Sequence, residues 1–254
     1  MAKKESISRT FIVATLLCLV CGVFVAAAAV QLKPLQEANA VMNLQRNVLM
    51  AADRFDPSTD VADQWGTVEE RYVDLATGRF VDAPEEGYDL DKILKNADQY
   101  TVIERSNDAA GIGRRENIVK VYVFNNANGI ERIVLPMRGK GLWSTMWGFM
   151  ALENDFNTVA GFTFYEHGET PGLGGEVDNP RWKAQWPGKT VYDVDGELQL
   201  TVTKAGQADS STGYEIDGLS GATLTTNGID GTVQYWMGEN GYRAFLENLK
   251  AGDA

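Results

Sequence analysis

The chain has 254 residues, of which 44% are hydrophobic and 23% charged, enough apolar material for one core of ordinary size with a small appendage. Its formal net charge of -12 argues against sequence-independent binding of nucleic acid, because that binding depends on clustered Lys and Arg side chains. One histidine, His167, and two cysteines are too few to hold a zinc ion, and a Ser-His-Asp hydrolase would depend on His167 alone.

Residues 11–32 contain no charged side chain. A run of this length can cross the hydrocarbon core of a bilayer as a helix. The alternative is a cleaved signal peptide, since the alanines at 26–29 could serve a signal peptidase. The run is longer than the apolar core of a signal peptide and an amphipathic segment follows it, so we expect an uncleaved transmembrane anchor.

The cations on either side of this run predict its orientation. Lys3, Lys4 and Arg9 precede it, whereas Lys33 is the only cation close behind it. The positive-inside bias therefore places residues 1–10 in the cytoplasm and everything after residue 32 outside it.

Both cysteines, Cys18 and Cys21, lie within the predicted span on about one face of a helix. Two thiols this close could share a redox or cluster role with partner subunits, or they could pack as small apolar side chains. The rest of the chain has no cysteine, so the exported part must form its core without a disulfide.

Residues 33–55 have the periodicity of an amphipathic helix that continues from the membrane as a stalk and packs on the domain. Its apolar positions recur at spacings near three and four, at Leu35, Val41, Leu44, Val48, Leu49 and Ala52. Residues 56–254 are then predicted to form a domain outside the cytoplasm. The domain starts with a hairpin over residues 72–82 that turns at Ala76 to Gly78, and residues 83–113 are too polar and loop-rich to assign.

The clearest strand signals follow. Residues 117–137 contain two β-branched runs joined by residues 125–129, which predicts a hairpin. A second pair of strands is expected at residues 147–152 and 158–166. We expect the two pairs to form one antiparallel sheet.

The last third of the chain mixes helices and strands. Residues 178–180 open a helix that continues to Gln185, and residues 198–204 are expected to form a strand. A final helical region should be capped by Thr226 or Asn227. Without a regular alternation of strand and helix, the order of elements favours an α+β fold, a membrane helix followed by an antiparallel sheet with flanking helices.

Two segments have unusual compositions. Residues 165–177, YEHGETPGLGGEV, place four glycines and a proline directly after a predicted strand. They could form a long loop, or they could let the backbone approach a flat ligand. Residues 141–152, GLWSTMWGFMAL, contain two tryptophans and two methionines, which could pack in the core or form the wall of a cofactor site.

Residues 217–227, DGLSGATLTTN, fit the pattern D-x-x-[ST]-G-A-[ST]. Gly221 and Ala222 would let a bulky group reach the Thr223 hydroxyl. The unpaired N–H groups of a helix that begins near Thr226 would favour an anion beside it. A turn or a simple helix cap is the alternative. Asp217 could orient this loop or help a modifying enzyme to recognise it.

These segments carry a family resemblance. DGLSGATLT resembles the flavinylation motif at which a dedicated flavin transferase joins FMN, through its phosphate, to a threonine hydroxyl as a phosphoester. With YEHGETPGLGG, GLWSTMWGFMAL and the N-terminal span, the chain is similar to the C subunit of the sodium-translocating NADH:quinone reductase (Nqr). The likeness runs from the membrane helix to the C-terminus and is weakest over residues 53–113.

The resemblance implies a set of cofactor-binding residues. Matching the motif places covalent FMN on Thr223 rather than on Thr225 or Thr226. The residues implied around the flavin are Ser220, Gly221, Ala222, Thr225, Glu169, Thr170, Leu173, Gly174, Leu142 and Trp143. No catalytic residue and no metal ligand is implied.

The implied function is that of an electron-carrying subunit of a sodium-pumping NADH:ubiquinone oxidoreductase in the inner membrane. Its partners would be the other Nqr subunits, and it would not be catalytically complete alone. The G subunit of an Rnf-type electron-transport complex shares the SGAT and ETPGLG segments, but GLWSTMWGFMAL favours Nqr. A third possibility is a membrane-anchored ligand-binding or scaffold domain without flavin.

Overall fold

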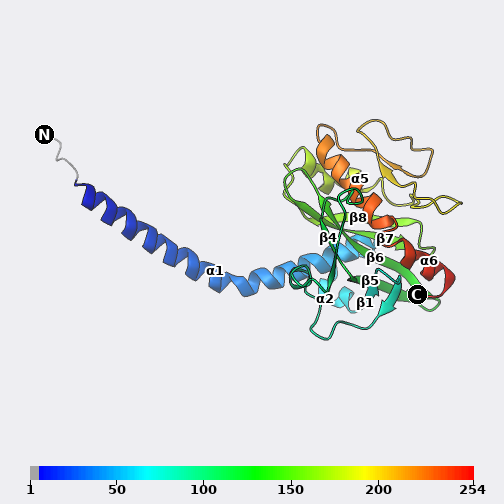
Figure 1. The fold of residues 1–254 in the computed structure, drawn as a ribbon, viewed down its shortest axis with the longest axis horizontal. Coiled ribbons are helices and arrows are strands. Elements are labelled where there is room, and N and C mark those ends of the chain that lie inside the picture. Colours follow the sequence, from blue (N-terminus) through cyan, green and yellow to red (C-terminus); the bar gives the residue numbers. More distant parts are fainter. Residues whose placement is uncertain (1–5) are drawn as a thin grey trace. The chain divides into compact units, whose positions relative to one another are not determined.

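The computed structural model describes residues 6–254, so Lys3 and Lys4 of the predicted cytoplasmic end lie outside the described residues. Contacts divide the chain into two units, one ending at Asn43 and the other formed by Leu44–Ala254. Helix α1 (Ile7–Ala51) begins in the first unit and ends in the second (Figure 1).

The part of α1 in the first unit has the properties of a membrane span. Its side chains are exposed throughout, and its most apolar window has a mean hydropathy of 2.7. By length and composition it can cross a bilayer. Pro34 lies inside α1 without ending it. Cys18 and Cys21 are exposed and are not joined in a disulfide.

The predicted stalk packs only at its end. Val48 and Leu49 are buried, whereas Leu35 and Val41 are exposed, so the expected apolar stripe is not used along its whole length. The helix also stops before residue 55. Asp53 has a φ of 52°, and the N–H of the next residue donates to the carbonyl of Leu49 at 2.8 Å, which closes the helix with a left-handed turn.

One antiparallel sheet forms the centre of the second unit, as predicted. Its strand order is β2-β1-β5-β6-β7-β8. The strands are β1 (Val68–Asp74), β2 (Arg79–Val81), β5 (Ile118–Asn126), β6 (Gly129–Lys140), β7 (Thr145–Glu153) and β8 (Val159–Glu166). The hairpins over residues 72–82 and 117–137 are confirmed, and so is the second pair of strands.

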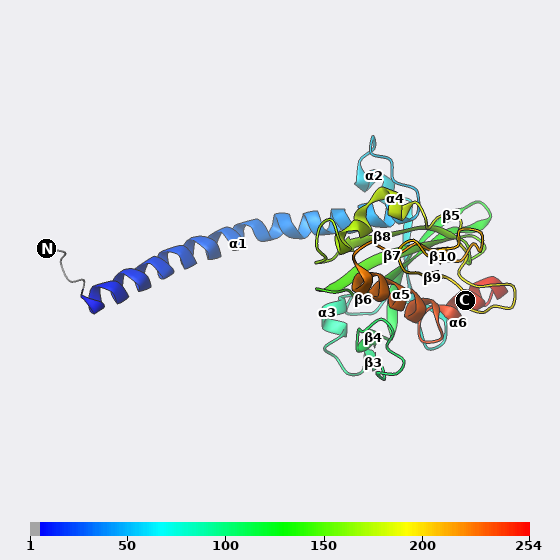
Figure 2. The ribbon, with the colours of Figure 1, turned by 90° about the horizontal axis from the view of Figure 1, so that it is seen from above.

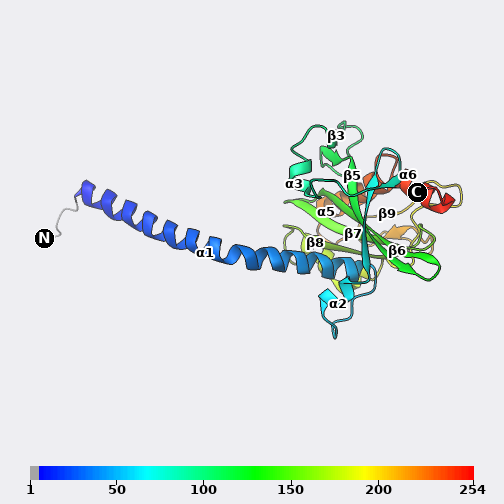
Figure 3. The same cartoon turned by 90° about the horizontal axis from the view of Figure 1, so that it is seen from below.

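Side chains alternate along every strand, and both faces of the sheet carry apolar side chains, so helices cover each face. On one face, Val121 and Leu135 pack in a core with side chains of α5 (Thr223–Met237) and α6 (Arg243–Ala251). On the other, Tyr122 and Phe149 pack with the end of α1. Figures 2 and 3 show the end of α1 and helix α5 on opposite sides of the sheet. The α+β class is confirmed.

Residues 83–113, which the sequence left unassigned, form short elements: α3 (Leu90–Ile93) and β3 (Tyr100–Val102), followed directly by β4 (Arg114–Glu116). A further short helix, α2 (Val61–Trp65), precedes the main sheet. Strands β3 and β4 form a separate antiparallel pair.

The elements after β8 differ in part from expectation. The 3-10 helix η1 (Gly174–Asp178) leads into α4 (Pro180–Lys183), which is capped by the Asn179 side chain at 2.9 Å from the N–H of Arg181, so a helix does open at the predicted position. The strand expected over residues 198–204 is only β9 (Thr201–Val202), and it pairs in parallel with β10 (Glu215–Ile216) outside the main sheet. The side chain of Asp230, in α5, accepts a hydrogen bond from the N–H of Val202 at 2.8 Å and so links this short strand to the helix.

The predicted cap at Thr226 or Asn227 is wrong, because α5 begins earlier, at Thr223. Gly221 has a φ of 74° and turns the chain into the helix, and Ala222 occupies the N-cap position without a side-chain bond. Thr226 does not cap, because its hydroxyl accepts the N–H of Leu219 from inside the first turn at 3.0 Å.

Candidate functional site

The carboxylate of Glu169 joins three segments that are far apart in the sequence. Its Oε1 accepts a hydrogen bond from the backbone N–H of Trp143, before β7, at 3.0 Å. Its Oε2 accepts one from the Thr225 hydroxyl, in the first turn of α5, at 2.5 Å. The structure thus brings the glycine-rich loop, the Trp143 segment and the 217–227 motif together.

Two glycines leave room for this carboxylate. A Cβ atom at Gly174 would lie 2.5 Å from Thr225 Oγ1 and 2.7 Å from Glu169 Oε2, and one at Gly141 would lie 2.5 Å from Glu169 Oε1. These separations are far below the roughly 3.5–4.0 Å of a favourable contact. A side chain at either glycine would therefore push the carboxylate away from its hydrogen-bond donors.

Glu169 is a buried carboxylate held in its charged form. Burial raises the pKa of its carboxyl, but the hydrogen bonds from Thr225 and from the N–H groups of Trp143 and Leu142 outweigh burial, and the pKa lies below its ordinary value. Because an ionised carboxylate only accepts hydrogen bonds, the Thr225 hydroxyl must donate its proton to Glu169.

Thr223 lies at the exposed start of α5. Among residues 6–254, no acceptor receives a hydrogen bond from the backbone N–H of Thr223, Leu224 or Thr225. Gly221 lies beside Leu173, whose side chain would be 3.4 Å from a Cβ atom at that glycine. Unpaired N–H groups at a helix start, next to a residue without a side chain, form a surface that an anion can approach.

The four hydroxyls of the 217–227 motif fall into two classes. Ser220 and Thr223 are exposed. Thr225 and Thr226 are 1% and 2% exposed, and both hydroxyls already have partners, Glu169 for Thr225 and the N–H of Leu219 for Thr226. Only the first two can be reached by another molecule without local rearrangement.

Exposed apolar side chains lie on the segments that Glu169 joins. Leu142, Trp143, Leu173 and Leu224 are all exposed, and Trp143 is 70% exposed. The sequence predicted the first three as flavin neighbours. Leu224 was not among the predicted residues, and its only signal in the sequence is that it directly follows Thr223. Thr170 is exposed too, and its carbonyl accepts the N–H of Gly175 at 2.9 Å, which closes a turn of the glycine-rich loop.

Two further residues missed by sequence reasoning hold this loop. The Ser144 hydroxyl accepts the N–H of Gly168 at 2.7 Å. His167 Nδ1 accepts the N–H of Glu169 at 3.2 Å, and its Nε2 lies 3.0 Å from the carboxylate of Asp178. The single histidine therefore shapes the loop. The pairing of a loop hydroxyl with a backbone N–H twenty-odd residues away has no signature in sequence.

Asp217 organises the chain next to the motif. Its Oδ1 accepts the N–H groups of Gly206 at 2.6 Å and Gln207 at 3.1 Å, and its own N–H donates to Gln185 at 2.9 Å. The carbonyl of Asp217 accepts the indole N–H of Trp182 at 2.9 Å. Asp217 thus fixes the entry of the loop that leads to Thr223.

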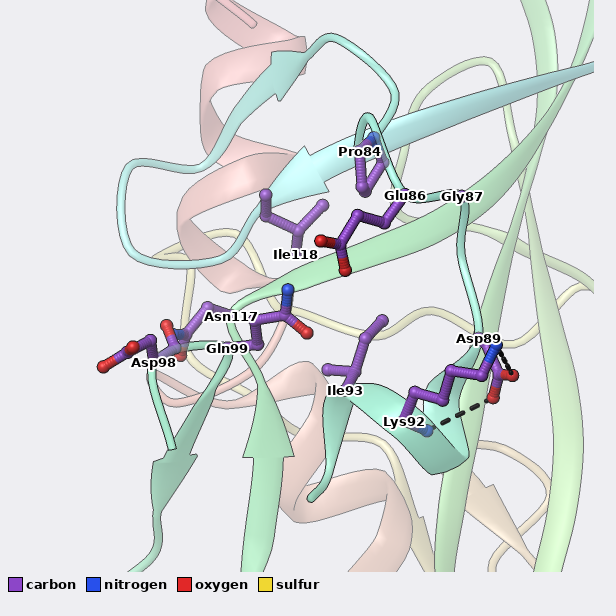
Figure 4. A pocket seen from close by; sticks show the side chains of 10 residues that line it. All are labelled: Pro84, Glu86, Gly87, Asp89, Lys92, Ile93, Asp98, Gln99, Asn117 and Ile118. Carbon is purple, nitrogen blue, oxygen red and sulfur yellow. Dashed lines mark hydrogen bonds and ion pairs between the residues drawn. The ribbon is translucent and has the colours of Figure 1, made fainter. Parts of the chain in front are cut away.

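A cavity of about 260 Å³ lies elsewhere in the second unit (Figure 4). Residues between Pro84 and Gln99 line it, together with Asn117 and Ile118, and Asp89 and Lys92 form an ion pair at its margin. It shares no lining residue with the Glu169 cluster, so the cavity is separate from the predicted site.

Comparison with known proteins assigns the chain to a family. Residues 141–238 match the model of the FMN-binding domain. The C subunit of the Na(+)-translocating NADH-quinone reductase of Pseudomonas aeruginosa is 45% identical over the whole of both chains. The chain belongs to the C-subunit family of these reductases. The corresponding protein of Neisseria meningitidis serogroup B is 44% identical, again over both whole chains.

Solved structures agree with this family assignment. The crystal structure of Shewanella oneidensis NqrC is 34% identical and superposes with a TM-score of 0.73, covering 82% of this chain and 96% of that one. The C-subunit structure from Parabacteroides distasonis is 25% identical with a TM-score of 0.66, covering 85% and 96%. The match to the FMN-binding domain spans every predicted site residue from Leu142 to Thr225. Membership in the C-subunit family replaces the Rnf alternative.

Proposed function

We propose that this chain is an electron-carrying subunit of a sodium-pumping NADH:ubiquinone oxidoreductase and carries FMN as a phosphoester on Thr223. The observation that carries the proposal is the state of the hydroxyls in the motif. Thr223 is exposed at the first position of α5, whereas the hydroxyls of Thr225 and Thr226 are buried and hydrogen-bonded.

The residues around Thr223 fit a flavin phosphate. The unpaired N–H groups of Thr223, Leu224 and Thr225 would face the phosphate, and the absence of a side chain at Gly221 gives it access. Leu142, Trp143, Leu173 and Leu224 supply exposed apolar surface for a planar ring. FMN supplies the redox chemistry when bound, and these residues hold it and exclude water from its ring.

The charge of the chain favours a covalent attachment. The chain has a net charge of -12, and one of its negative charges, Glu169, is buried near the helix start. Such a protein has little general attraction for a phosphate dianion. A covalent ester would hold the group without depending on that attraction.

The proposed location is the inner membrane, with one span. Residues 11–32 of α1 cross the bilayer, residues 1–10 lie in the cytoplasm, residues 33–55 form the stalk segment, and residues 56–254 form the periplasmic domain. The apolar window of α1 and the cations that precede it support this topology. The proposed partners are the other Nqr subunits and, during maturation, a flavin transferase.

In-gel fluorescence of the denatured full-length chain tests the proposal. Protein from a host with an active transferase should give a fluorescent band that survives SDS, and Thr223→Ala should abolish it. Thr225→Val is the matched control, because it removes a hydroxyl two residues away that is buried and already bonded. Its band should persist.

A peptide mass spectrum covering residues 205–242 should place the FMN mass on Thr223. A band that Thr223→Ala leaves unchanged would move the attachment to another residue. Protein with no flavin in the presence of an active transferase would instead support an anchored ligand-binding or scaffold domain.

A further inference from the structure

Both oxygens of the Glu169 carboxylate are already engaged within the chain. Oε1 takes the N–H of Trp143 and Oε2 takes the hydroxyl of Thr225. The residue is only 5% exposed, so its carboxylate faces protein and not solvent. A side chain in this state acts on a bound group through the residues that it holds.

We propose that Glu169 is a positioning residue that holds the Leu142–Trp143 segment against the first turn of α5, so that a flavin ring tethered at Thr223 meets a fixed apolar wall. This inference rests on the proposed function for the identity of the ring. The link itself is a property of the chain, because it joins the exposed Trp143 to the turn of helix that begins with Thr223.

The backbone on either side of Glu169 is held as well, so the carboxylate is aimed by its surroundings. The N–H of Gly168 donates to the hydroxyl of Ser144, and the N–H of Glu169 itself donates to His167 Nδ1. The missing side chains at Gly141 and Gly174 leave a slot that the two carboxylate oxygens fill. Supporting contacts of this kind are what keep a binding surface in one geometry.

The link is strongest with a carboxylate. Its two oxygens accept hydrogen bonds from Trp143 and from Thr225, and bonds to a charged acceptor are roughly twice as strong as neutral ones. Glu169→Gln removes the charge, and its NH2 group can meet Thr225 only by donating to the hydroxyl, so this variant weakens the link without cutting it. Thr225→Val cuts the same link from the helix side and leaves the charge in place.

The test uses the full-length chain, produced with its transferase and purified in detergent, as wild type, Glu169→Gln and Thr225→Val. Visible circular dichroism of the flavin and the decay of its fluorescence anisotropy report how firmly the ring is held. We expect weaker flavin dichroism and a gain of nanosecond depolarisation in both variants, while the SDS-stable band keeps its wild-type intensity. Thr225→Ser, which restores the hydroxyl, should restore both signals.

Thr232→Val is the matched control. Thr232 is buried in the same helix, but its hydroxyl donates to the carbonyl of Gly228 within α5. Its removal leaves the Glu169 link intact, so the flavin signals should stay at the wild-type level. Glu169→Gln combined with Thr225→Val should be no worse than Thr225→Val alone, since both act on the same link.

Wild-type flavin dichroism and anisotropy in folded Glu169→Gln and Thr225→Val would overturn the proposal. Loss of the SDS-stable band in these variants would overturn it too, because Glu169 would then act on attachment. Should Glu169→Gln fail to fold, Thr225→Val decides.

Hydrogen exchange separates this inference from the proposed function. In a Thr223→Ala background, which carries no flavin, the Trp143 amide should exchange faster when Thr225→Val or Glu169→Gln is added. Equal exchange rates would refute the link even if FMN proves to be attached at Thr223. Wild-type protein without an SDS-stable band would refute the attachment and leave the exchange test of the link standing.

Discussion

Replacing Gly174 by alanine should destabilise the domain through the Glu169–Thr225 hydrogen bond. The new Cβ would lie 2.5 Å from Thr225 Oγ1 and 2.7 Å from Glu169 Oε2, so one of the two must move. Glu169 is 5% exposed and has no open space to enter. A lost hydrogen bond to a charged group costs about 1.5–3 kcal/mol.

This cost corresponds to a fall in melting temperature of about 3–12 °C, at about 2–4 °C per kcal/mol for a domain of this size. Thermal unfolding followed by circular dichroism measures it. Gly66→Ala is the matched control, because its nearest atom, the carbonyl oxygen of Asp63, would lie at 3.4 Å and Gly66 has an ordinary φ of -59°. If Gly174→Ala had the same melting temperature as the Gly66→Ala control, the carboxylate would not be confined as described.

Three further predictions concern stability and pH. The lowered pKa of Glu169 stabilises the fold fully above the unfolded pKa of about 4.3, and this contribution is lost as the pH falls from there through the folded pKa. Wild type should therefore lose more melting temperature between about pH 5 and pH 3 than Glu169→Gln does, and parallel losses over that range would contradict it. Glu116 and Arg138 form a buried ion pair at 2.6 Å, and Glu116→Gln should cost about 3–5 kcal/mol in urea unfolding, whereas a cost below about 1 kcal/mol would mean that the buried charge is compensated elsewhere. Asp217→Ala should cost about 1.5–3 kcal/mol because it frees the N–H groups of Gly206 and Gln207, whereas Asp217→Asn keeps an acceptor and should cost less; equal unfolding midpoints for the two variants would refute this role.

The central sheet could be predicted because its signals are local. Residues 117–137 alternate β-branched side chains around a short turn, and the observed β5–β6 hairpin follows from that pattern. The hairpin at residues 72–82 likewise turns at Gly78, whose φ of 64° suits a residue without a side chain. In both cases the pairing partner lies a few residues away along the chain.

The elements that could not be predicted depend on distant partners. Strand β4 is three residues long. The side chain of Asn117, which directly follows β4, accepts a hydrogen bond from the Thr101 hydroxyl at 2.7 Å, and no sequence pattern connects these two residues. The start of α5 was misplaced for a different reason: the Thr226 hydroxyl has the chemistry of a cap, but it accepts the N–H of Leu219 from inside the first turn, and nothing in the sequence distinguishes these two uses.

The candidate site divides along the same line. The attachment motif and the glycine-rich loop are short and recognisable, so Thr223 and Glu169 could be selected from sequence. The bond between Glu169 and Thr225 joins residues 56 positions apart and could only be seen in the fold. Sequence could therefore suggest which residues would surround a flavin but not which of them hold the others.

The packing of α5 explains why its first residue suits a tethered redox group. Gly228 and Gly231 sit against the backbone carbonyls of Lys140 and Ala109, closer than any side chain would allow. Glycine inside a helix costs about 1 kcal/mol relative to alanine, so both positions lower the helix propensity of α5 but allow close backbone packing. Through Gly228 the helix contacts the end of β6, just before Trp143, and through Gly231 it contacts the loop at Ala109. At its other end the helix is fixed by Trp236, whose indole N–H donates to the carbonyl of Arg138 at 2.8 Å.

A flavin on Thr223 would therefore be attached to the end of the rigid helix α5, and the segment next to that helix, Leu142–Trp143, would contact the ring. The backbone on both sides of the ring would be held by packing and by Glu169, so the remaining freedom would lie in the threonine side chain, the ester and the ribityl chain of FMN itself. Contact between the ring and the fixed Leu142–Trp143 segment would limit that freedom. The orientation of the domain would then set the distance from the ring to an electron partner.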